Sequence, residues 1–345
     1  MSLSQRLLAA AERGVLPDAL IRAGIRRLCR ARLRELGADP ARRAAALEQF
    51  VADMDRAPLA LVPEKANEQH YELPPAFLAL CLGARRKYSS CWFPPGIDEL
   101  DRAEEAALEQ SCARAELEDG QRILELGCGW GSLTLWMAER YPRASITALS
   151  NSTPQRLHIE SELARRGLRN VRVLTADING FETAERFHRV VSIEMFEHLR
   201  NWRELFARIA RWLEPGGKLW FHVFCHRDTA YAFETAGEDD WMGRYFFSGG
   251  MMPSDDLALR FQRDLELEAR WRWDGTHYQR TAEAWLANLD RRRAEALPLL
   301  EQVYGAAEAP RWLQRWRMFF LACAELFGFA AGREWWVAHY RLARR

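Results

Sequence analysis

Hydrophobic residues in the middle of the chain form short runs that alternate with amphipathic stretches. The short runs are rich in β-branched residues and predict buried strands, whereas the amphipathic stretches predict helices. Strand–helix–strand repeats of this length require right-handed crossovers, so we expect an α/β fold with a doubly wound, mostly parallel sheet. The predicted strands are 122–126, 145–149, 171–175, 189–193 and 218–224, and the predicted helices between them are 132–140, 154–166 and 202–212.

Two of these helices carry signals at their ends. Thr153 is placed to cap the second helix, with Pro154 in its first turn. The third helix is followed by the sequence EPGG at 214–217, which predicts a helix stop.

Residues 1 to about 60 are rich in Ala, Leu and Arg and predict further helices. Between 20 and 36 the hydrophobic residues recur at helical spacing with arginines between them. A basic amphipathic helix of this kind can bind a membrane surface or a partner. The simpler interpretation, which we favour, packs one face on the protein and exposes the other. The segment PLALVPEK at 58–65 predicts a linker, so we divide the chain into an N-terminal helical extension, 1–64, and a main domain, 65–345.

The pattern loosens after residue 225. Helices are expected from about 281, with Thr281 as a cap, and from about 309, with Pro310 in the first turn. The second of these carries an aromatic stripe that includes Trp316 and Phe319. The sequence EWWVAHYRL at 334–342 predicts a final strand of the sheet.

Composition restricts the class of protein. Of the 345 residues, 48% are hydrophobic and 28% charged, which is typical of a globular protein, and the net charge of +1 gives no general attraction to nucleic acid or anionic membranes. No run approaches the roughly 20 apolar residues that span a bilayer, and the amphipathic N-terminus does not resemble a signal peptide. The seven cysteines are scattered without a Cys-x-x-Cys pair, so we expect a reducing, cytoplasmic location.

The stretch ILELGCGWGS at 123–132 joins the first predicted strand to its helix, with glycines at Gly127, Gly129 and Gly131. Glycine lets the backbone approach a ligand closely. The spacing is G-x-G-x-G, not the G-x-G-x-x-G of nicotinamide sites, and the second strand ends in Ser-Asn-Ser at 150–152, not in an acid. A phosphate-binding Lys is also absent after the glycines. These features favour a ligand without phosphates, a nucleoside that carries an amino-acid tail.

Two acidic residues fit the same ligand. Glu125, at the turn, suits an ammonium group, and Asp177, just past the third strand, suits an adenine amino group. The predicted cofactor is therefore S-adenosylmethionine, with S-adenosylhomocysteine as its product.

Several motifs occur in order through most of the chain, among them HYELPPAFLALCLGARRKYSSCWF, SIEMFEHLRNW, FHVFCHRD, RYFFSGGMMPS and GTHYQRT. With the glycine turn, they resemble the class I S-adenosylmethionine-dependent methyltransferases. Over residues 65–345 they are similar to the cyclopropane-fatty-acid-synthase-like group, and within it most to the coclaurine-type N-methyltransferases of benzylisoquinoline alkaloid pathways.

The resemblance implies a Rossmann-like, seven-stranded sheet and helices over the site as a lid, at about 226–330. Members often form homodimers, so a homodimer is an expectation for this chain. The resemblance implies that the cofactor is bound by Tyr88, Ser89, Gly127, Gly129, Ser150, Asn151, Gln155, Asp177 and Ile178. We add Glu125 and Gly131 from the glycine turn to this set.

The pentapeptide EMFEH follows the fourth strand and carries the candidate catalytic residues Glu194, Glu197 and His198. On a helical turn these three side chains would share one face. An aliphatic amine is mostly ammonium at pH 7, so a carboxylate that attracts the cation and an imidazole that helps accept its proton suit methyl transfer to nitrogen. The resemblance assigns catalysis to Glu194 and His198, with Glu197 secondary. Glu72 is a further candidate for contact with the amine.

The alternative chemistry is cyclopropanation of an unsaturated lipid chain. The resemblance implies that such a site uses a Cys, a Glu, a His and a Tyr around a bicarbonate. Glu194, His222 and Tyr278 match that set, but KYSSCWF places Ser90 at the cysteine position and moves the thiol to Cys91. In an extended stretch this shift turns the thiol to the opposite face, which weakens the lipid interpretation.

Eleven of the 14 tryptophans follow residue 200, and aromatic walls suit a ring-bearing amine. The candidate substrate-binding residues are Phe246, Phe247, Phe327 and Trp335, each of which could equally be core.

The sequence HVFCH lacks further ligands at suitable spacing, so we expect no metal. With neither a basic groove nor an Asn-Pro-Pro-Tyr motif, a nucleic-acid methyltransferase is disfavoured. The sequence thus predicts an N-methyltransferase acting on a small cyclic amine, with a cofactor-binding protein without turnover as the other class.

Overall fold

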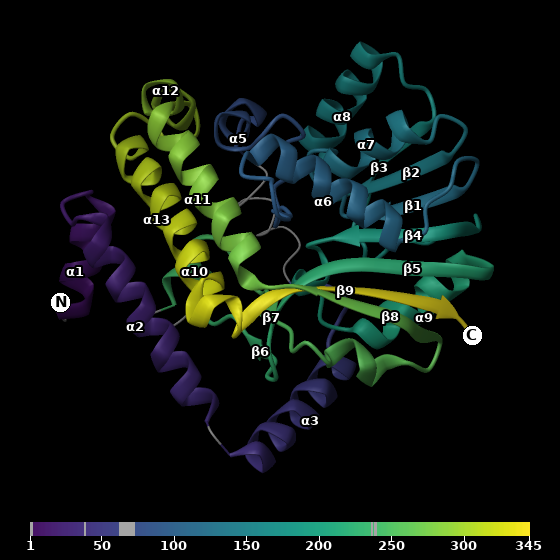
Figure 1. Cartoon of the computed structure of the whole chain (residues 1–345), viewed down its shortest axis with the longest axis horizontal. Helices are drawn as coiled ribbons and strands as arrows, with labels where there is room; N and C mark the ends of the chain where they lie inside the picture. Colours follow the sequence, from purple (N-terminus) through teal and green to yellow (C-terminus); the bar gives the residue numbers. More distant parts are fainter. Residues whose placement is uncertain (1–2, 38, 62–72, 236, 238–239) are drawn as a thin grey trace.

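The computed structural model describes residues 3–37, 39–61, 73–235, 237 and 240–345. Within these ranges a seven-stranded sheet has the order β3-β2-β1-β4-β5-β9-β8, and β9 is antiparallel to both of its neighbours (Figure 1). The predicted α/β fold with a mostly parallel sheet is therefore confirmed. The strands are β1 Arg122–Leu126, β2 Ser145–Ser150, β3 Val171–Thr175, β4 Phe187–Ile193, β5 Leu213–His226, β8 Leu265–Trp273 and β9 Trp335–Arg344.

Helices cover both faces of the sheet. On one face, Ile123, Val191 and Trp220 pack in a core with α6 (Leu100–Arg114), α7 (Ser132–Arg140) and α8 (Thr153–Arg166). On the other face, the alternate strand residues pack with α9 (Trp202–Trp212) and α3 (Pro40–Arg56). A sheet that is buried on both faces needs apolar residues at successive strand positions, which explains the continuous hydrophobic runs in the sequence.

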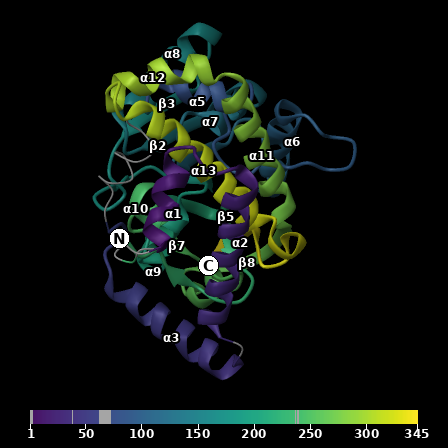
Figure 2. The ribbon, with the colours of Figure 1, turned by 90° about the vertical axis from the view of Figure 1, so that its left-hand side faces the viewer.

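A separate helical layer lies beyond one end of the sheet, at the left of Figure 1. It shares one large apolar cluster, which contains Trp285, Trp316 and Phe319. Figure 2, turned so that this side faces the viewer, shows α1, α2, α11, α12 and α13 together. The helices of this layer are α1 Leu3–Glu12, α2 Asp18–Leu36, α5 Pro75–Cys81, α10 Trp241–Tyr245, α11 Gly275–Arg291, α12 Arg293–Tyr304 and α13 Ala309–Phe327.

The N-terminal extension is divided between these two parts of the molecule. α1 and α2 join the helical layer, where they contact α13, whereas α3 packs on α9 beneath the sheet. Arg22 of α2 pairs with Glu283 at 2.5 Å and with Glu325 at 2.9 Å, so the basic helix packs one face on the protein. None of the helices that the structure describes is both long and apolar enough to cross a membrane.

Some element boundaries differ from the prediction. Ser152, not Thr153, caps α8, because its Oγ accepts a hydrogen bond from the Gln155 N–H. The sequence EPGG lies inside β5, which begins directly after α9. Thr281 is buried in the middle of α11, because that helix starts at Gly275 with Asp274 as its cap.

The expected lid at 226–330 is only partly helical. It also contains a small ribbon of β6 (Tyr231–Ala232) and β7 (Met251–Met252), and it contains β8 of the main sheet. The final strand, β9, is not at the edge of the sheet but lies between β5 and β8.

The first residues of the predicted linker are packed against the sheet. Leu59 and Ala60 are buried, the Arg200 N–H donates to the Leu59 carbonyl oxygen at 2.7 Å, and the Ala60 N–H donates to Asn179 Oδ1 at 3.0 Å. This segment therefore belongs to the sheet's carboxyl edge, and 62–65 lie outside the described residues.

Candidate active site

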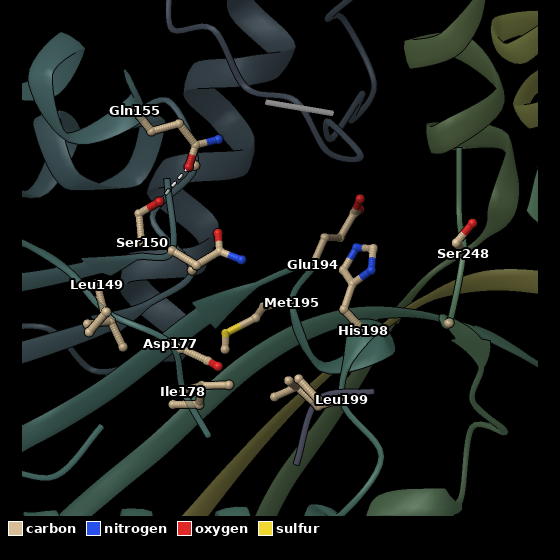
Figure 3. A pocket seen from close by; sticks show the side chains of 16 residues that line it. Leu149, Ser150, Gln155, Asp177, Ile178, Glu194, Met195, His198, Leu199 and Ser248 are labelled. Carbon is tan, nitrogen blue, oxygen red and sulfur yellow. Dashed lines mark hydrogen bonds between the residues drawn. The ribbon is translucent and has the colours of Figure 1, made fainter. Parts of the chain in front are cut away.

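A cavity opens at the carboxyl ends of β1, β2, β3 and β4 (Figure 3). Together with the solvent-filled space at its mouth, it contains about 760 Å³ of empty volume. Its lining consists of Ala60, Gly127, Gly129, Leu149, Ser150, Asn151, Gln155, Ala176, Asp177, Ile178, Glu194, Met195, His198, Leu199, Ser248 and Gly249.

The glycine turn forms one wall of this cavity with its backbone. Gly127 and Gly129 have φ values of +76° and +52°, in the left-handed region that favours glycine. A Cβ atom on Gly127 would lie 2.9 Å from Met195 Cβ, so no side chain fits there without displacing that residue. The Gly127 and Cys128 N–H groups both donate to the Leu149 carbonyl oxygen, which fixes the turn against the end of β2.

Polar side chains at the ends of β2 and β3 form the adjoining wall. Ser150 Oγ donates to Gln155 Oε1 at 2.7 Å, as Figure 3 shows, while the buried Gln155 Nε2 has no partner in the part of the protein that the structure describes. Asp177 Oδ1 accepts from the Asn179 N–H at 2.9 Å. An unsatisfied buried donor is costly, so Gln155 favours a ligand with an acceptor group at this place. These residues fit the hydroxyls and base of a nucleoside, as the predicted cofactor requires.

Four of the predicted cofactor residues do not line the cavity. Gly131 lies at the start of α7, where a Cβ atom would lie 2.7 Å from Ile159 Cγ1, so this glycine allows close packing. Tyr88 packs on the ring of Trp285, and Ser89 Oγ accepts from Lys87 Nζ at 2.6 Å.

Glu125 is the fourth of these residues. It is buried beneath the turn, where its Oε2 accepts from Thr134 Oγ1 at 2.5 Å. Burial raises the pKa of Glu125 to about 7. This geometry does not favour the direct contact with an ammonium group that the sequence suggested.

Glu194 stands at the end of β4 with a strained backbone. Its φ of +46° is unusual for a residue with a side chain. The Glu194 N–H donates to the His222 carbonyl oxygen at 2.9 Å, which holds this conformation. Strain of this kind costs about 1–3 kcal/mol and is concentrated at functional sites. Here it turns the carboxylate into the cavity (Figure 3).

The Glu194 carboxylate accepts three hydrogen bonds from distant parts of the chain. Oε1 accepts from the Ser90 N–H at 3.0 Å and from His222 Nε2 at 3.1 Å. Oε2 accepts from the Tyr278 hydroxyl at 2.8 Å. Because an ionised carboxylate has about four acceptor positions, the described residues leave one on Oε2 for a further donor.

Burial and neighbouring charges set the protonation of the two glutamates. Burial raises the pKa of Glu194, while the Lys87 ammonium and the hydrogen bonds from Ser90 and Tyr278 oppose the rise. Burial, with the charge of Glu194, raises the pKa of Glu197 well above its usual range, so the neutral form of Glu197 is favoured. The Glu194 carboxylate is thus supported by donors from other segments and by a nearby cation, whereas the hydrogen bond that opposes the pKa rise of Glu197 comes from its own backbone N–H.

His198 lies beside Glu194 in the cavity wall, as Figure 3 shows. Its ring is parallel to that of Phe247, with centroids 5.5 Å apart. Burial lowers the pKa of His198 to about 4, so the imidazole is neutral at pH 7. A neutral imidazole can accept a hydrogen bond from a ligand N–H group.

The expectation that Glu194, Glu197 and His198 share a helical face is wrong. The turn after β4 is a short 3-10 helix, Phe196–His198, and Glu194 precedes it in the left-handed conformation. Glu197 is consequently buried outside the cavity lining, and no described residue is a hydrogen-bond partner for its Oε2.

None of the four predicted aromatic residues lines the cavity, but Phe247 packs behind it, on the ring of His198. Phe246 stacks on Phe319 in the core of the helical layer, and Phe327 stacks on Tyr278 behind Glu194. Trp335 Nε1 donates to the Tyr231 hydroxyl. These three residues do not line the cavity. Glu72 lies outside the described residues.

Several lining residues were not among the predicted site residues. Met195 lies within the EMFEH motif and Leu199 directly follows it, and Ser248 and Gly249 belong to RYFFSGG, a motif already singled out for the resemblance. Ala60 had no such signal. Among the described residues, no three His, Cys, Asp or Glu side chains are grouped so that they could hold a metal ion.

Comparisons with known proteins agree with this arrangement. The profile of the mycolic acid cyclopropane synthetase family matches residues 62–332. The chain is 38% identical to (S)-coclaurine N-methyltransferase of Thalictrum flavum subsp. glaucum over 80% of its length and 78% of the relative. It is 33% identical to the enzyme of the same name from Papaver somniferum over 97% of both chains. A crystal structure of coclaurine N-methyltransferase bound to N-methylheliamine and S-adenosylhomocysteine superposes with a TM-score of 0.94 at 36% identity, covering 98% of each chain. Cyclopropane-fatty-acyl-phospholipid synthase of Escherichia coli is 28% identical over 80% of this chain and 67% of the synthase.

Proposed function

The chain belongs to the mycolic acid cyclopropane synthetase family of S-adenosylmethionine-dependent methyltransferases, and we propose that it methylates the nitrogen of a small cyclic amine such as a tetrahydroisoquinoline. The observation that carries this proposal is the open acceptor position on Glu194 Oε2, beside His198 in the cavity wall. The similarity to coclaurine N-methyltransferases over nearly the full chain supports the same substrate class.

The cofactor and the amine would occupy different walls of one cavity. When bound, S-adenosylmethionine supplies a methyl group on a positively charged sulfur. Gly127 and Gly129 would hold it through their backbone, and Gln155 and Asp177 through their side chains. Glu194 and His198 would face the amine.

Glu194 is the better proton acceptor of this pair. Aliphatic ammonium groups titrate near about 10, whereas the pKa of His198 is lowered to about 4. Proton transfer from the ammonium to His198 is therefore strongly uphill. Burial moves the pKa of Glu194 in the opposite direction, toward that of the amine. We assign Glu194 to attracting and deprotonating the ammonium, and His198 to orienting the nitrogen through a hydrogen bond.

Methylation of an unsaturated lipid chain is the second candidate function. It is favoured by one observation, the convergence of His222 and Tyr278 on Glu194, which are the residues that the resemblance associates with cyclopropanation. Against it, position 90 is serine, and Cys91 is buried with Phe93 and Ala103 outside the cavity lining.

A methyl-transfer screen separates these functions. The purified protein is incubated with S-adenosylmethionine and, in turn, cyclic amines, linear amines and monounsaturated phospholipids, and the products are identified by mass. We expect N-methylated cyclic amines with stoichiometric release of S-adenosylhomocysteine. Modification of the phospholipids alone would replace the amine proposal with the lipid one. Cofactor binding without any turnover would indicate a protein that uses the site for binding only.

A further inference from the structure

We propose that Arg114, His339 and His222 form a one-way hydrogen-bond chain that keeps the Glu194 carboxylate oriented and anionic. The inference rests on the proposed function, because it assigns positioning residues to the carboxylate that faces the amine. Arg114 and His339 touch neither the cavity nor Glu194, so they act through His222.

The chain is continuous from the end of α6 to the catalytic carboxylate. Arg114 Nη1 lies 2.8 Å from His339 Nδ1. His339 Nε2 lies 3.0 Å from His222 Nδ1, because the two histidines are directly opposite each other in the β5–β9 pair. His222 Nε2 lies 3.1 Å from Glu194 Oε1.

The chemistry of the two ends fixes the direction of every bond. An arginine guanidinium can only donate, so His339 Nδ1 must accept and its Nε2 carries the proton. His339 Nε2–H therefore donates to His222 Nδ1, and His222 Nε2–H donates to Glu194. An ionised carboxylate can only accept, which requires the same direction from the other end. Protonating either ring at its second nitrogen would place two donors face to face.

The environment holds this arrangement. Both histidines are fully buried, and burial lowers the pKa of each well below its usual range, so both remain neutral. The rings of Trp220 and Trp273 pack edge-on against His339. The Arg114 guanidinium lies over Trp271 and Trp273, and although burial lowers its pKa to about 10, it stays charged at pH 7.

Other charged and titratable groups face Glu194 from every side of the site. Lys87 and Cys91 approach from the segment before α6, Tyr278 from α11, Cys323 from α13, and Glu197 and His198 from the turn after β4. Lys87 Nζ donates to Ser89 Oγ and to the Ser90 carbonyl oxygen, so its contribution to Glu194 is a charge and not a hydrogen bond. Within the described residues, the chain from Arg114 ends in the His222 Nε2–H, which donates to Glu194. Its first member, the Arg114 guanidinium, is charged and lies outside the cavity lining.

A one-way chain cannot remove a proton from Glu194. Outward transfer would require Glu194 to donate, both histidines to reverse, and Arg114 to accept, which a guanidinium cannot do. The chain therefore favours the charged form of Glu194 without conducting protons. Breaking it should lower kcat and move the acid limb of the pH profile upward, while the KM of the amine is unchanged.

The direction of the hydrogen bonds in the chain is tested first, without any substrate. Nitrogen-15 NMR of the histidine-labelled protein, with His222→Gln and His339→Gln used for assignment, reports which ring nitrogen carries the proton. We expect both rings to be neutral, with the proton on Nε2. A proton on Nδ1 of either ring, or a doubly protonated ring, would overturn the proposal even if the enzyme proves to be an N-methyltransferase.

Kinetics then test the consequence. For Arg114→Met we expect a fall in kcat of about tenfold at pH 7, an upward shift of the acid limb by about 0.5–1 pH unit, and an amine KM within about twofold of the wild type. Arg114→Lys, which keeps the charge and a donor, should recover most of the rate.

Arg189→Met is the matched control, because Arg189 is also half-buried near the end of α6 but, among the described residues, hydrogen-bonds only to carbonyl oxygens of Ala115, Glu116 and His188 and lies 3.8 Å from the Glu116 carboxylate. If Arg114→Met does not fold, Arg114→Gln takes its place. An acid limb and kcat equal to those of Arg189→Met would overturn the proposal. If no amine is methylated by the wild type, the proposed function fails, and the NMR result still decides the direction of the chain.

Discussion

The two walls of the cavity are built on different physical principles. The wall that we propose for the cofactor, between Gly127 and Ile178 and called the cofactor wall below, comes from one contiguous part of the chain and presents mainly backbone and neutral polar groups. The acceptor wall comes from scattered segments, and its central group, Glu194, is held by donors from Ser90, His222 and Tyr278. A substitution in the first wall should act through shape and affect cofactor binding. A substitution in the second should act through charge and affect the chemical step.

Replacing Glu194 with Gln should have the largest effect on turnover. The amide keeps the shape of the Glu194 side chain but loses its negative charge and its ability to accept a proton from the amine. We therefore expect kcat to fall by about 10²–10⁴-fold. Binding of S-adenosylhomocysteine, measured by calorimetry, should stay within about threefold of the wild type. Glu197→Gln is the matched comparison, because a carboxyl that is already neutral should cost less than about tenfold in kcat. Equal losses in the two variants would remove the distinction between the glutamates.

Gly127→Ala should break the cofactor wall. The new Cβ requires a left-handed backbone that costs about 1–2 kcal/mol for other residues, and it must displace Met195. We expect S-adenosylhomocysteine to bind about 10–100-fold more weakly by calorimetry. Saturating S-adenosylmethionine should then restore most of kcat, in contrast to Glu194→Gln. Tight binding by Gly127→Ala would contradict the assignment of this turn to the cofactor.

Phe247→Ala should weaken the acceptor wall without changing its charge. The phenyl ring supports His198, and stacked aromatic pairs contribute about 0.5–1.5 kcal/mol. Steady-state kinetics should show an amine KM that rises by about 3–10-fold, with cofactor affinity unchanged. Phe246→Leu is a control in the neighbouring core, which does not line the cavity. The same KM change in both variants would indicate a general loss of packing.

Glu125→Gln should have the smallest effect on function, although Glu125 lies next to the glycine turn. Cofactor affinity should remain within about twofold, because the carboxyl contacts Thr134 and not the cavity. Burial raises the folded-state pKa of Glu125 to about 7. The neutral carboxyl therefore contributes its full stability below the pKa of the unfolded state, and this contribution is lost as the pH rises through about 7. Thermal unfolding should therefore show that the free energy of unfolding of Glu125→Gln rises relative to that of the wild type between pH 5 and 8, by about 1–3 kcal/mol. A large loss of cofactor affinity would restore the original ammonium-binding hypothesis.

Much of the central fold could be predicted from the sequence, because both faces of the sheet are covered. β1 to β4 and the helices α7 and α9 carry runs or periodicities that local structure and burial both require. β8 was not predicted, because LELEARWRW alternates with charged and exposed residues at the edge of the sheet. The start of α11 was misplaced because Thr281 has the chemistry of a cap, whereas Asp274 occupies that position.

The two walls of the cavity also differ in how far they could be predicted from the sequence. Local motifs were enough to predict that Gly127, Ser150 and Asp177 line one cavity, since each lies at or just after the end of a strand. The partners of Glu194 could not be derived locally, because they lie 28 to 104 residues away in the sequence. The expected position of Glu197 on one face with Glu194 was wrong, because helical spacing does not apply to a left-handed residue followed by a 3-10 turn.

The pH dependence of a single turnover, with S-adenosylmethionine already bound, tests the central claim most directly. In the wild type, the rate should rise with pH and level off well below the pKa of the free amine, because Glu194 removes the proton in the site. In Glu194→Gln the rate should continue to rise toward that pKa, since the free base must come from solution. Profiles of the same shape in the two proteins would show that Glu194 does not prepare the nitrogen for attack.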